Sequence, residues 1–203
     1  ASSGSGAGLI RTPDRARAVL RAARQGLLDW AAGQTLEAAG FKPARAALFR
    51  AMNERRAGAG APARRVLPFS VKTRIGYDEV VIEEWIAHLL EERPAAISVH
   101  GRTLAQMYRG EADWSAIARA VRLARGTGTL LFGNGDVQSL RDVVRRVQAS
   151  GVDGVLVGRG ALGEPWFFRD KERARALARG PEAADGDLDG PVTPPLGLDE
   201  RVR

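Results

Sequence analysis

The stretch Ile97-Ser98-Val99-His100-Gly101-Arg102-Thr103 is an apolar run that ends abruptly in glycine and charged or polar residues. Two later stretches end in the same way, Leu131-Phe132-Gly133-Asn134-Gly135-Asp136 and Val155-Leu156-Val157-Gly158-Arg159-Gly160, and so does the earlier stretch at residues 69–76. Buried parallel strands read as apolar runs of this kind, and in barrels built of them the functional groups lie at the carboxyl ends. The four runs therefore predict parallel strands that share one functional edge.

Helical periodicity lies between these runs. We predict strands at about residues 67–75, 95–100, 129–133 and 153–158, with helices at 79–92, 113–125, 137–150 and 165–179. Asp78 is expected to cap the first of these helices, and Gly151 is expected to end the third. The spacing between strands is roughly that of a β-α-β unit. The alternation predicts a parallel α/β fold.

The regions on either side of this alternation differ from it. Thr12-Pro13-Asp14 has the composition of a helix start, and that helix is expected to end at Gly33. Residues 36–56 are predicted to be helical again. Residues 181–203 are rich in Gly, Pro and Asp, which is typical of a flexible linker, and they close on what reads as the start of another helix.

The composition excludes several kinds of protein. The chain has 203 residues, which is enough for one domain with a sizeable core, and it has no cysteine. Disulfides, thiolate metal sites and a cysteine nucleophile are therefore excluded within these residues, and we expect no metal. No apolar run approaches the roughly 18 residues of a membrane span, and no signal peptide is evident. We expect a soluble, cytoplasmic protein.

The net charge of +7 is concentrated near the N-terminus. Residues 1–70 hold 12 Lys and Arg against 4 Asp and Glu, whereas residues 71–168 hold 12 of each. A basic segment beside a neutral core indicates a polyanionic partner such as nucleic acid. A solvated helix face in an arginine-rich chain is the alternative, and charge alone does not separate the two.

Two strand ends have the residues of a phosphate site. In Gly158-Arg159-Gly160 the glycines let a phosphate approach the backbone N–H groups, and the arginine adds a bidentate cation. Asn134-Gly135-Asp136 ends the preceding strand. In (β/α)8 barrels the loops after the last two strands commonly bind phosphate, so the pair favours a phosphate site over two simple turns.

Lys72 and His100 end the two earlier strands. The chain has 28 Arg but only 3 Lys, and Lys72 is the only lysine within a predicted strand, which favours a point charge in a tight site over chance. A lone histidine is more often structural, but His100 occupies the same position at a strand end as Lys72 and Asn134. Arg102 ends the same strand as His100. Arg74 and Arg109 are either phosphate contacts or solvated.

These residues together resemble the tRNA-dihydrouridine synthase family. The similarity covers about residues 66–168 in unbroken order. It lies in Ser70-Val71-Lys72-Thr73-Arg74-Ile75-Gly76, Val99-His100-Gly101-Arg102-Thr103, Gln106-Met107-Tyr108, Ala112-Asp113-Trp114, Gly133-Asn134-Gly135-Asp136 and Gly158-Arg159-Gly160-Ala161-Leu162-Gly163-Glu164-Pro165-Trp166. The resemblance implies an FMN-containing (β/α)8 TIM barrel, followed by a helical tRNA-binding domain. Such an enzyme reduces uridine in tRNA to 5,6-dihydrouridine with electrons from NADPH.

The resemblance also implies roles for the residues at the first two strand ends. Lys72 would face the flavin ring near its N1/O2 edge and stabilise the anionic reduced flavin. His100 would contact the cofactor and the uracil. Arg74 and Arg102 would be the candidates for contact with tRNA or uracil. The uridine must leave its stack to meet the flavin, at a cost of a few kcal/mol.

The last two strand ends would hold the other side of the cofactor. Asn134, Gly135 and Asp136 would bind the ribityl-phosphate side of FMN, largely through backbone groups. Gly158 and Arg159 would hold the phosphate.

The chain departs from the family in three places. The family's catalytic acid is a cysteine in an Asn-x-Gly-Cys-Pro loop, so we assign no catalytic residue to a chain without cysteine. The family's first strands would precede residue 1, and most of its helical domain would follow residue 198. We therefore expect the second half of a TIM barrel, with a partial FMN-binding domain at 1–180 that holds a helical insertion at 34–64. Residues 181–203 would be a linker and the truncated start of the helical domain.

This arrangement predicts a fragment that is inactive alone and that needs tRNA and the missing N-terminal half of the barrel as partners. Two alternatives stay open. One is another FMN- or phosphate-binding TIM-barrel enzyme, and the other is a non-catalytic tRNA-binding remnant without flavin.

Overall fold

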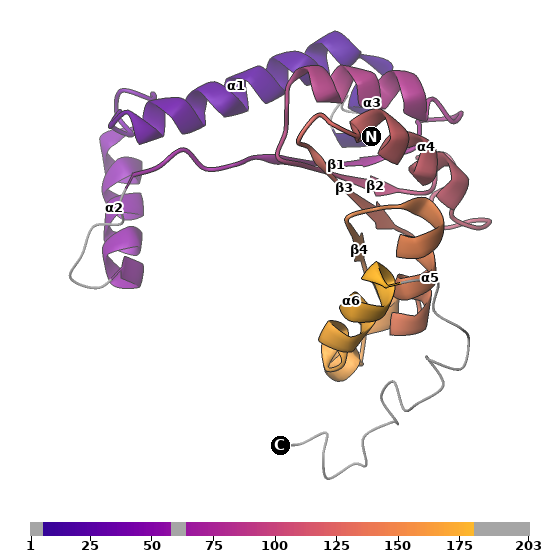
Figure 1. Cartoon of the computed structure of the whole chain (residues 1–203). Coiled ribbons are helices and arrows are strands. Elements are labelled where there is room, and N and C mark those ends of the chain that lie inside the picture. The colour runs from indigo at the N-terminus through magenta and orange to yellow at the C-terminus, as the bar shows by residue number, and fades with distance from the viewer. Residues whose placement is uncertain (1–5, 58–63, 181–203) are drawn as a thin grey trace. The chain divides into compact units, whose positions relative to one another are not determined.

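The computed structural model describes residues 6–57 and 64–180, and Figure 1 shows the arrangement of their helices and strands. The chain divides into two compact units. One comprises residues 17–69, and the other comprises residues 1–16 together with residues 70–203. The sheet and the strand-end residues belong to the second of these, which we call the sheet unit, and residues 17–69 form the helical unit.

The sheet unit has four parallel strands in chain order. They are β1 (Ser70–Arg74), β2 (Ala96–His100), β3 (Leu130–Asn134) and β4 (Gly154–Leu156). This confirms the predicted α/β class with parallel strands, as expected for part of a barrel. The register aligns Arg74 with His100, His100 with Asn134, and Asn134 with Leu156. The carboxyl ends of all four strands therefore meet at one edge.

A helix follows each strand and packs on the helix after it in the chain. These helices are α3 (Ile82–Glu91), α4 (Trp114–Ala124), α5 (Leu140–Ser150) and α6 (Lys171–Arg179), and consecutive ones are in contact. The core lies between helices and strands. Ile86, Leu89 and Ile117 from the helices and Ile97 and Leu131 from the strands are almost fully buried.

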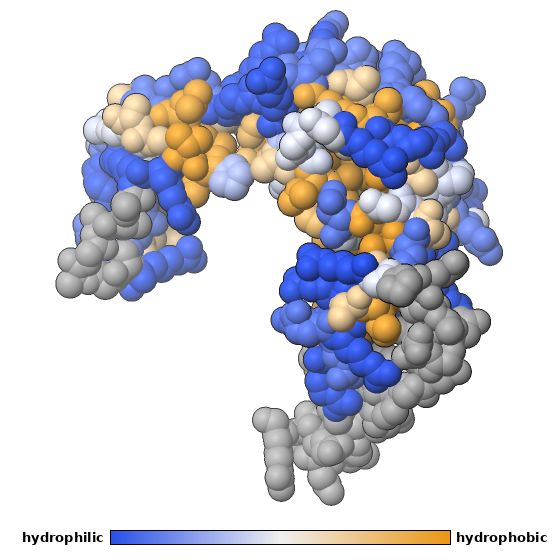
Figure 2. Space-filling model, in the orientation of Figure 1, coloured by the Kyte–Doolittle hydropathy of each residue, from blue (hydrophilic) through white to orange (hydrophobic). Residues whose placement is uncertain are grey.

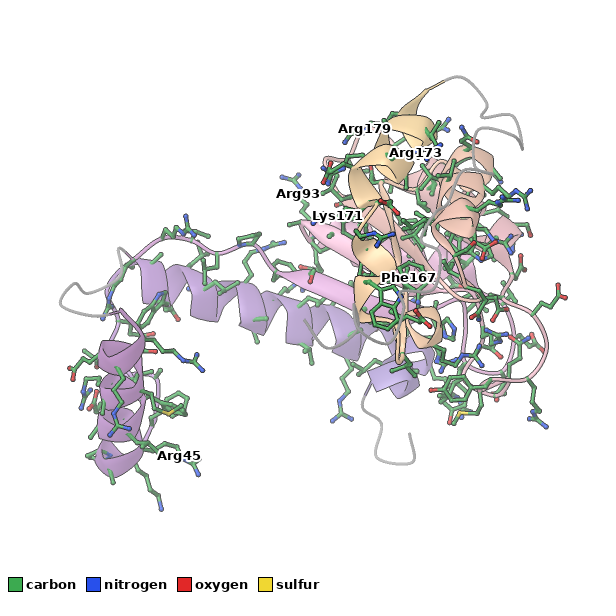
Figure 3. All side chains as sticks on the ribbon, turned by 90° about the horizontal axis from the view of Figure 1, so that it is seen from below. Arg45, Arg93, Phe167, Lys171, Arg173 and Arg179 are labelled. Atoms are coloured by element: carbon green, nitrogen blue, oxygen red, sulfur yellow. The ribbon has the colours of Figure 1, made fainter. Side chains whose placement is uncertain are left out.

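Side chains tie the helices to the sheet at defined points. Trp85 on α3 donates its Nε1–H to the Thr73 hydroxyl on β1 at 2.8 Å, and both residues are buried. A second small cluster joins α5 to α6, where Leu140 and Val144 pack with Phe167 and Ala174. Figure 3 labels Phe167. These contacts hold the loop after β4 next to the loop after β3.

Some helix ends lie where the sequence predicted them, and others do not. The Asp113 carboxylate caps α4, Ser139 and Asp142 form a capping box on α5, and Gly151 ends α5 in the left-handed conformation as predicted. The predicted cap at Asp78 is wrong, because the loop folds back so that the Val81 N–H bonds to Ile75 O and α3 begins only at Ile82.

The last predicted helix, at 165–179, is divided in two. Pro165 opens a short 3-10 helix, η3 (Pro165–Phe168), and α6 begins at Lys171. Another short 3-10 helix, η2 (Arg159–Ala161), follows the end of β4 after two intervening residues. η2 therefore holds the predicted phosphate-binding segment close to the end of its strand.

The residues before β1 contain one more short element and two long helices. The 3-10 helix η1 (Gly6–Arg11) contacts β1, and α1 (Pro13–Ala31) begins at the expected proline. The prediction of a helix at 36–56 was wrong at its start, because residues 36–40 form turns and α2 (Pro43–Ala57) begins at a proline, which helix interiors exclude.

No helix in the described ranges is long and apolar enough to cross a membrane. The predicted insertion at 34–64 lies inside the helical unit, and its status relative to other family members stays a prediction. The predicted domain boundary at 180 also stays a prediction, since residues 181–203 lie outside the described part of the chain.

Candidate functional site

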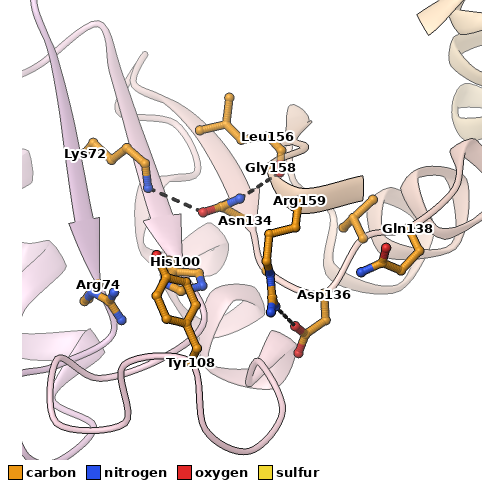
Figure 4. Close-up of a pocket in the computed structure, with 12 residues that line it drawn as sticks. Lys72, Arg74, His100, Tyr108, Asn134, Asp136, Gln138, Leu156, Gly158 and Arg159 are labelled. Carbon is orange, nitrogen blue, oxygen red and sulfur yellow. Dashed lines mark hydrogen bonds and ion pairs between the residues drawn. The ribbon is translucent and has the colours of Figure 1, made fainter. Parts of the chain in front are cut away.

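A cavity of about 290 Å³ lies at the carboxyl end of the sheet (Figure 4). Seven of its lining residues are those predicted to bind the cofactor: Lys72, His100, Asn134, Gly135, Asp136, Gly158 and Arg159. Arg74, predicted to contact substrate, also lines it. The strand register explains why these residues lie together. The four strands end level with one another, and each predicted residue lies at the end of a strand or in the loop that follows it.

Asn134 joins three strands across the floor of the cavity. Lys72 Nζ donates to Asn134 Oδ1 at 3.4 Å, and Asn134 Nδ2 donates to Leu156 O at 2.8 Å (Figure 4). Partial burial, with a smaller contribution from the nearby charge of Arg74, lowers the pKa of Lys72. Lys72 is therefore a cation held in a partly desolvated position, where an anionic group would stabilise it.

His100 lies between the cationic side chains of the cavity. Partial burial lowers its pKa from 6.5 to about 4, and the positive charges of Arg74, Lys72 and Arg102 contribute to the shift. At neutral pH the imidazole is uncharged, so one ring nitrogen donates a hydrogen bond and the other accepts one. His100 therefore offers a ligand both functions without adding to the positive charge.

Asp136 is the centre of the polar network on the other side. Its carboxylate accepts hydrogen bonds from the Ala112 N–H at 2.7 Å and from Arg102 Nη2 at 2.7 Å, and it pairs with Arg159 Nη2 at 3.2 Å. Burial alone would raise the pKa of Asp136, but the Ala112 N–H and the two guanidinium groups lower it overall. One ionised carboxylate thus links the loops after β2, β3 and β4.

Arg102 supports the cavity from beneath instead of lining it. Its side chain is only 3% exposed, and besides Asp136 it donates to the backbone oxygens of Arg109 and Gly110. This burial argues against the predicted contact of Arg102 with tRNA or uracil. Arg102 is better described as the residue that orients Asp136.

Arg159 and Arg74 have different freedom at the rim. The Arg159 side chain is 54% exposed, and its guanidinium carbon lies 5.4 Å from the centroid of the Tyr108 ring. Arg74 Nη1 donates to Thr103 O at 2.9 Å and so ties the loop after β2 to β1. The Arg159 guanidinium, paired with Asp136 through Nη2, is therefore still open to a ligand, whereas Arg74 is tied to the backbone of the loop after β2.

Two glycines give the cavity its shape. Gly135 has a φ of +131°, and a Cβ there would come within 2.5 Å of the Ala112 Cβ, so the backbone can approach the loop after β2 this closely only without a side chain. A Cβ on Gly158 would meet no atom within 4 Å, which means that the backbone before η2 faces open space. A phosphate could approach it there.

Some lining residues had no role in the sequence analysis. Tyr108, Val137, Gln138 and Leu156 also border the cavity. Tyr108 belongs to the Gln106-Met107-Tyr108 motif, so a signal for it was present, but its place opposite Arg159 depends on the fold of the loop after β2. Within the described residues, no three His, Asp or Glu side chains lie close enough to hold a metal ion.

Comparisons with known proteins agree with the resemblance seen in the sequence. The family model described as dihydrouridine synthase matches residues 60–184. A probable tRNA-dihydrouridine synthase of Mycobacterium tuberculosis is 40% identical over 110 residues, which cover 53% of this chain and 28% of that relative. The probable tRNA-dihydrouridine synthase of Aquifex aeolicus is 34% identical over 114 residues, or 56% of this chain and 35% of that one.

A third relative is the tRNA-dihydrouridine synthase B of Pseudomonas syringae pv. tomato, which is 36% identical over 108 residues, or 52% of this chain and 31% of that relative. The chain thus spans about a third of the length of the curated relatives it matches. All four strands and all seven predicted cofactor residues lie inside the matched range.

Proposed function

We propose that this chain, which belongs to the dihydrouridine synthase family, forms the FMN-binding face of an enzyme that reduces uridine in tRNA to 5,6-dihydrouridine with NADPH. The observation that carries the proposal is the cavity at the strand ends. Among its described lining residues, the cations Lys72, Arg74 and Arg159 outnumber the single carboxylate of Asp136. Such a cavity favours an anionic ligand with polar groups along its length.

The residues present suit FMN. Gly158 leaves backbone open to a phosphate, and Arg159 is exposed beside it, so these two would hold the phosphate. Asn134 and Gly135 would border the ribityl chain. Lys72 would contact the flavin ring, and its positive charge would stabilise the negative charge of the reduced ring. FMN that has been reduced by NADPH would supply the hydride for the uracil double bond, and an acid would supply the proton that completes the reduction.

The chain's own residues prepare the cavity for this ligand. Asp136 holds Arg159 within reach of the phosphate position, and Arg102 holds Asp136 in turn. The neutral imidazole of His100 can hydrogen-bond the flavin or an extruded uracil without repelling the cation at Lys72. The acid that the family uses is a cysteine, and these residues include none, so we propose that they do not catalyse by themselves.

Flavin titration of the purified chain tests this function. We expect FMN to bind, with Arg159→Ala weakening it by about 10- to 100-fold, because a hydrogen bond to a charged group contributes about 1.5–3 kcal/mol. Riboflavin, which lacks the phosphate, should bind equally to both proteins. Arg122→Ala, an exposed change on α4, is the matched control.

Two results would contradict the proposal. Absence of flavin binding would favour a tRNA-binding remnant. An equal loss of affinity for FMN and riboflavin in Arg159→Ala would show that Arg159 does not bind the phosphate.

A separate experiment tests catalysis. Incubation of the chain with tRNA, FMN and NADPH should give no dihydrouridine. Turnover would show that the chain is active without the family's cysteine.

A further inference from the structure

The helical unit carries the whole net charge of the protein. Residues 17–69 hold 10 Lys and Arg against 3 Asp and Glu, which leaves 21 of each sign in the rest of the chain. The charge excess noted in the sequence is therefore the property of one compact unit. A net charge of this density attracts polyanions at long range and raises their local concentration.

Within this unit, α2 presents its side chains to solvent. Ala46 is buried and Ala51 is half-buried, whereas the remaining residues from Pro43 to Arg56 are exposed. Large apolar side chains are among them: Leu48 is 58% exposed and Met52 is 43% exposed. A helix that leaves such side chains in water has a face without a partner inside its own unit.

The exposed residues of α2 are ordered around the helix. At 3.6 residues per turn, one face about 120° wide holds Arg45, Leu48, Phe49, Met52, Arg55 and Arg56. We call this set the basic-apolar face. Glu54, the only acidic residue of α2, lies about 2.5 turns from Arg45 and thus on the opposite side. Figure 3 marks Arg45 on this helix.

The arginines of the basic-apolar face are available to a ligand. Neither Arg45 nor Arg55 nor Arg56 forms a side-chain ion pair within residues 6–57 and 64–180. By contrast, Arg50 on another side of α2 pairs with Glu37 at 2.8 Å. The arrangement thus separates an internally neutralised side of the helix from a side with three arginines and no carboxylate.

Aromatic rings lie beside these arginines. Phe49 packs edge-on against Phe41, with ring centroids 5.7 Å apart, and both rings are more than a third exposed. Figure 2 shows hydrophobic and hydrophilic surface next to one another on the helical unit. Arginines spaced around exposed aromatic and apolar side chains match single-stranded RNA, whose phosphates need cations and whose bases need surfaces to stack on.

We propose that the basic-apolar face of α2 binds RNA at a loop where bases are unstacked. The identification of this RNA as tRNA rests on the proposed function, whereas the binding itself rests on the face alone. A second copy of the chain could also cover apolar side chains, but two faces with three arginines each would repel one another. Charge therefore favours a polyanion over self-association.

Removal of the arginines tests the electrostatic part. In the full chain, Arg45→Gln, Arg55→Gln and Arg56→Gln are combined, and the matched control, on exposed sites of the sheet unit, combines Arg93→Gln, Arg122→Gln and Arg125→Gln. Fluorescence anisotropy measures binding of unmodified tRNA transcript between about 50 and 200 mM salt. We expect the α2 variant to bind at least about tenfold more weakly, with a slope of log K against log salt shallower by about 2. The control should change affinity by less than about twofold.

Removal of the ring tests the stacking part. Phe49→Ala should weaken tRNA binding by about tenfold and leave the salt slope unchanged, because base stacking involves no counterion release. Binding to a fully paired RNA duplex should not respond to this change. Phe168→Ala, an exposed phenylalanine of the sheet unit, is the matched control, and melting curves check that each variant is folded.

Three outcomes would overturn the proposal. The α2 triple variant and the control triple variant could lose equal affinity for tRNA, which would show that only the net charge of the protein matters. Phe49→Ala could bind both RNAs like the wild type. Finally, tRNA affinity could stay unchanged in the α2 variants, while Leu48→Ser combined with Met52→Ser lowers the oligomeric mass measured by sedimentation. That result would make the face a self-association surface. FMN affinity is measured in parallel, so failure of the flavin site is seen separately from failure of RNA binding.

Discussion

Gly135 shows how one residue sets the shape of the cavity. Its φ of +131° is open to glycine alone, and the space where a Cβ would lie is already filled by Ala112. The Trp114 Nε1–H donates to the Gly135 oxygen at 3.0 Å, so α4 fixes the backbone on that side. A methyl group here must displace Ala112 and the loop that carries it, or the backbone at Gly135 itself.

Gly135→Ala should therefore destabilise the protein by about 1–3 kcal/mol, the usual cost of a residue held in a sparsely populated conformation. Urea unfolding followed by circular dichroism measures this. Gly26→Ala is the control, because Gly26 lies inside α1 with no atom near its Cβ position, and alanine favours helix there. Equal stability of the two variants would mean that the loop after β3 adapts without strain.

His100 gives the protein a measurable dependence on pH. Its folded pKa of about 4 lies below the ordinary 6.5, so the unfolded chain takes up a proton more readily. Its contribution to stability is complete above pH 6.5 and is lost as the pH falls toward 4. We expect the melting temperature to fall over this window, and the fall should be smaller in His100→Asn.

His88→Asn on α3 is the control for loss of an imidazole elsewhere. If wild type and His100→Asn lose the same amount between pH 6.5 and 4, the histidine is not held neutral by its burial and its cationic neighbours. The experiment needs no ligand, so it tests the described geometry of the cavity directly.

The sequence predicted most single residues of the cavity and missed how they support one another. Lys72, His100, Asn134 and Arg159 could be found because parallel strands bring their carboxyl ends together, and that follows from the order of the apolar runs. The burial of Arg102 could not be predicted. Its partner Asp136 is 34 positions away in the chain, and no local pattern distinguishes a buried, paired arginine from a solvated one.

At the scale of secondary-structure elements, α3 is held on β1 by a polar contact in an apolar core. Thr73→Val keeps the shape of the side chain but leaves the Trp85 Nε1–H without an acceptor, which should cost about 1–3 kcal/mol of unfolding free energy. Trp85→Phe and the double variant complete a thermodynamic cycle. A coupling energy near zero would show that the two groups do not stabilise one another.

Elements were predictable where periodicity is strong and less so at their ends. α4 and α5 begin within three residues of the predicted starts, because Asp113 and Ser139 are good caps. The error at 79–92 arose from tertiary structure, since Val81 bonds back to Ile75 instead of joining the helix. At 36–56 the proline at position 43 was a local signal against one continuous helix.

For the molecule as a whole, the order β1-β2-β3-β4 leaves two edges. Among the described residues, β1 and β4 pair on one side only, whereas β2 and β3 pair on both. Hydrogen exchange should therefore be slower in β2 and β3 than in β4. Equal protection of β4 and β3 would mean that a further segment or a second copy pairs with the β4 edge.

The sequence described the whole molecule less completely than its parts. Residues 1–70 carried a charge excess that allowed either a nucleic-acid surface or a solvated helix. Only the division into two units assigned the charge to residues 17–69, and only the geometry of α2 separated its arginines from Glu54. The division into units is a tertiary property that no local pattern reveals. The face of α2 follows from helical periodicity, but which of its side chains are exposed does not.

The sheet order has a consequence for how the protein is made. Each strand pairs with the one before it in the chain, so during synthesis each β-α unit can add to an already formed neighbour soon after it leaves the ribosome. The cavity is completed later than the first strands of the sheet. Its carboxylate and its exposed arginine, Asp136 and Arg159, follow the third and fourth strands, so they emerge after Lys72 and His100, and a nascent chain completes the cavity only once β4 has been made.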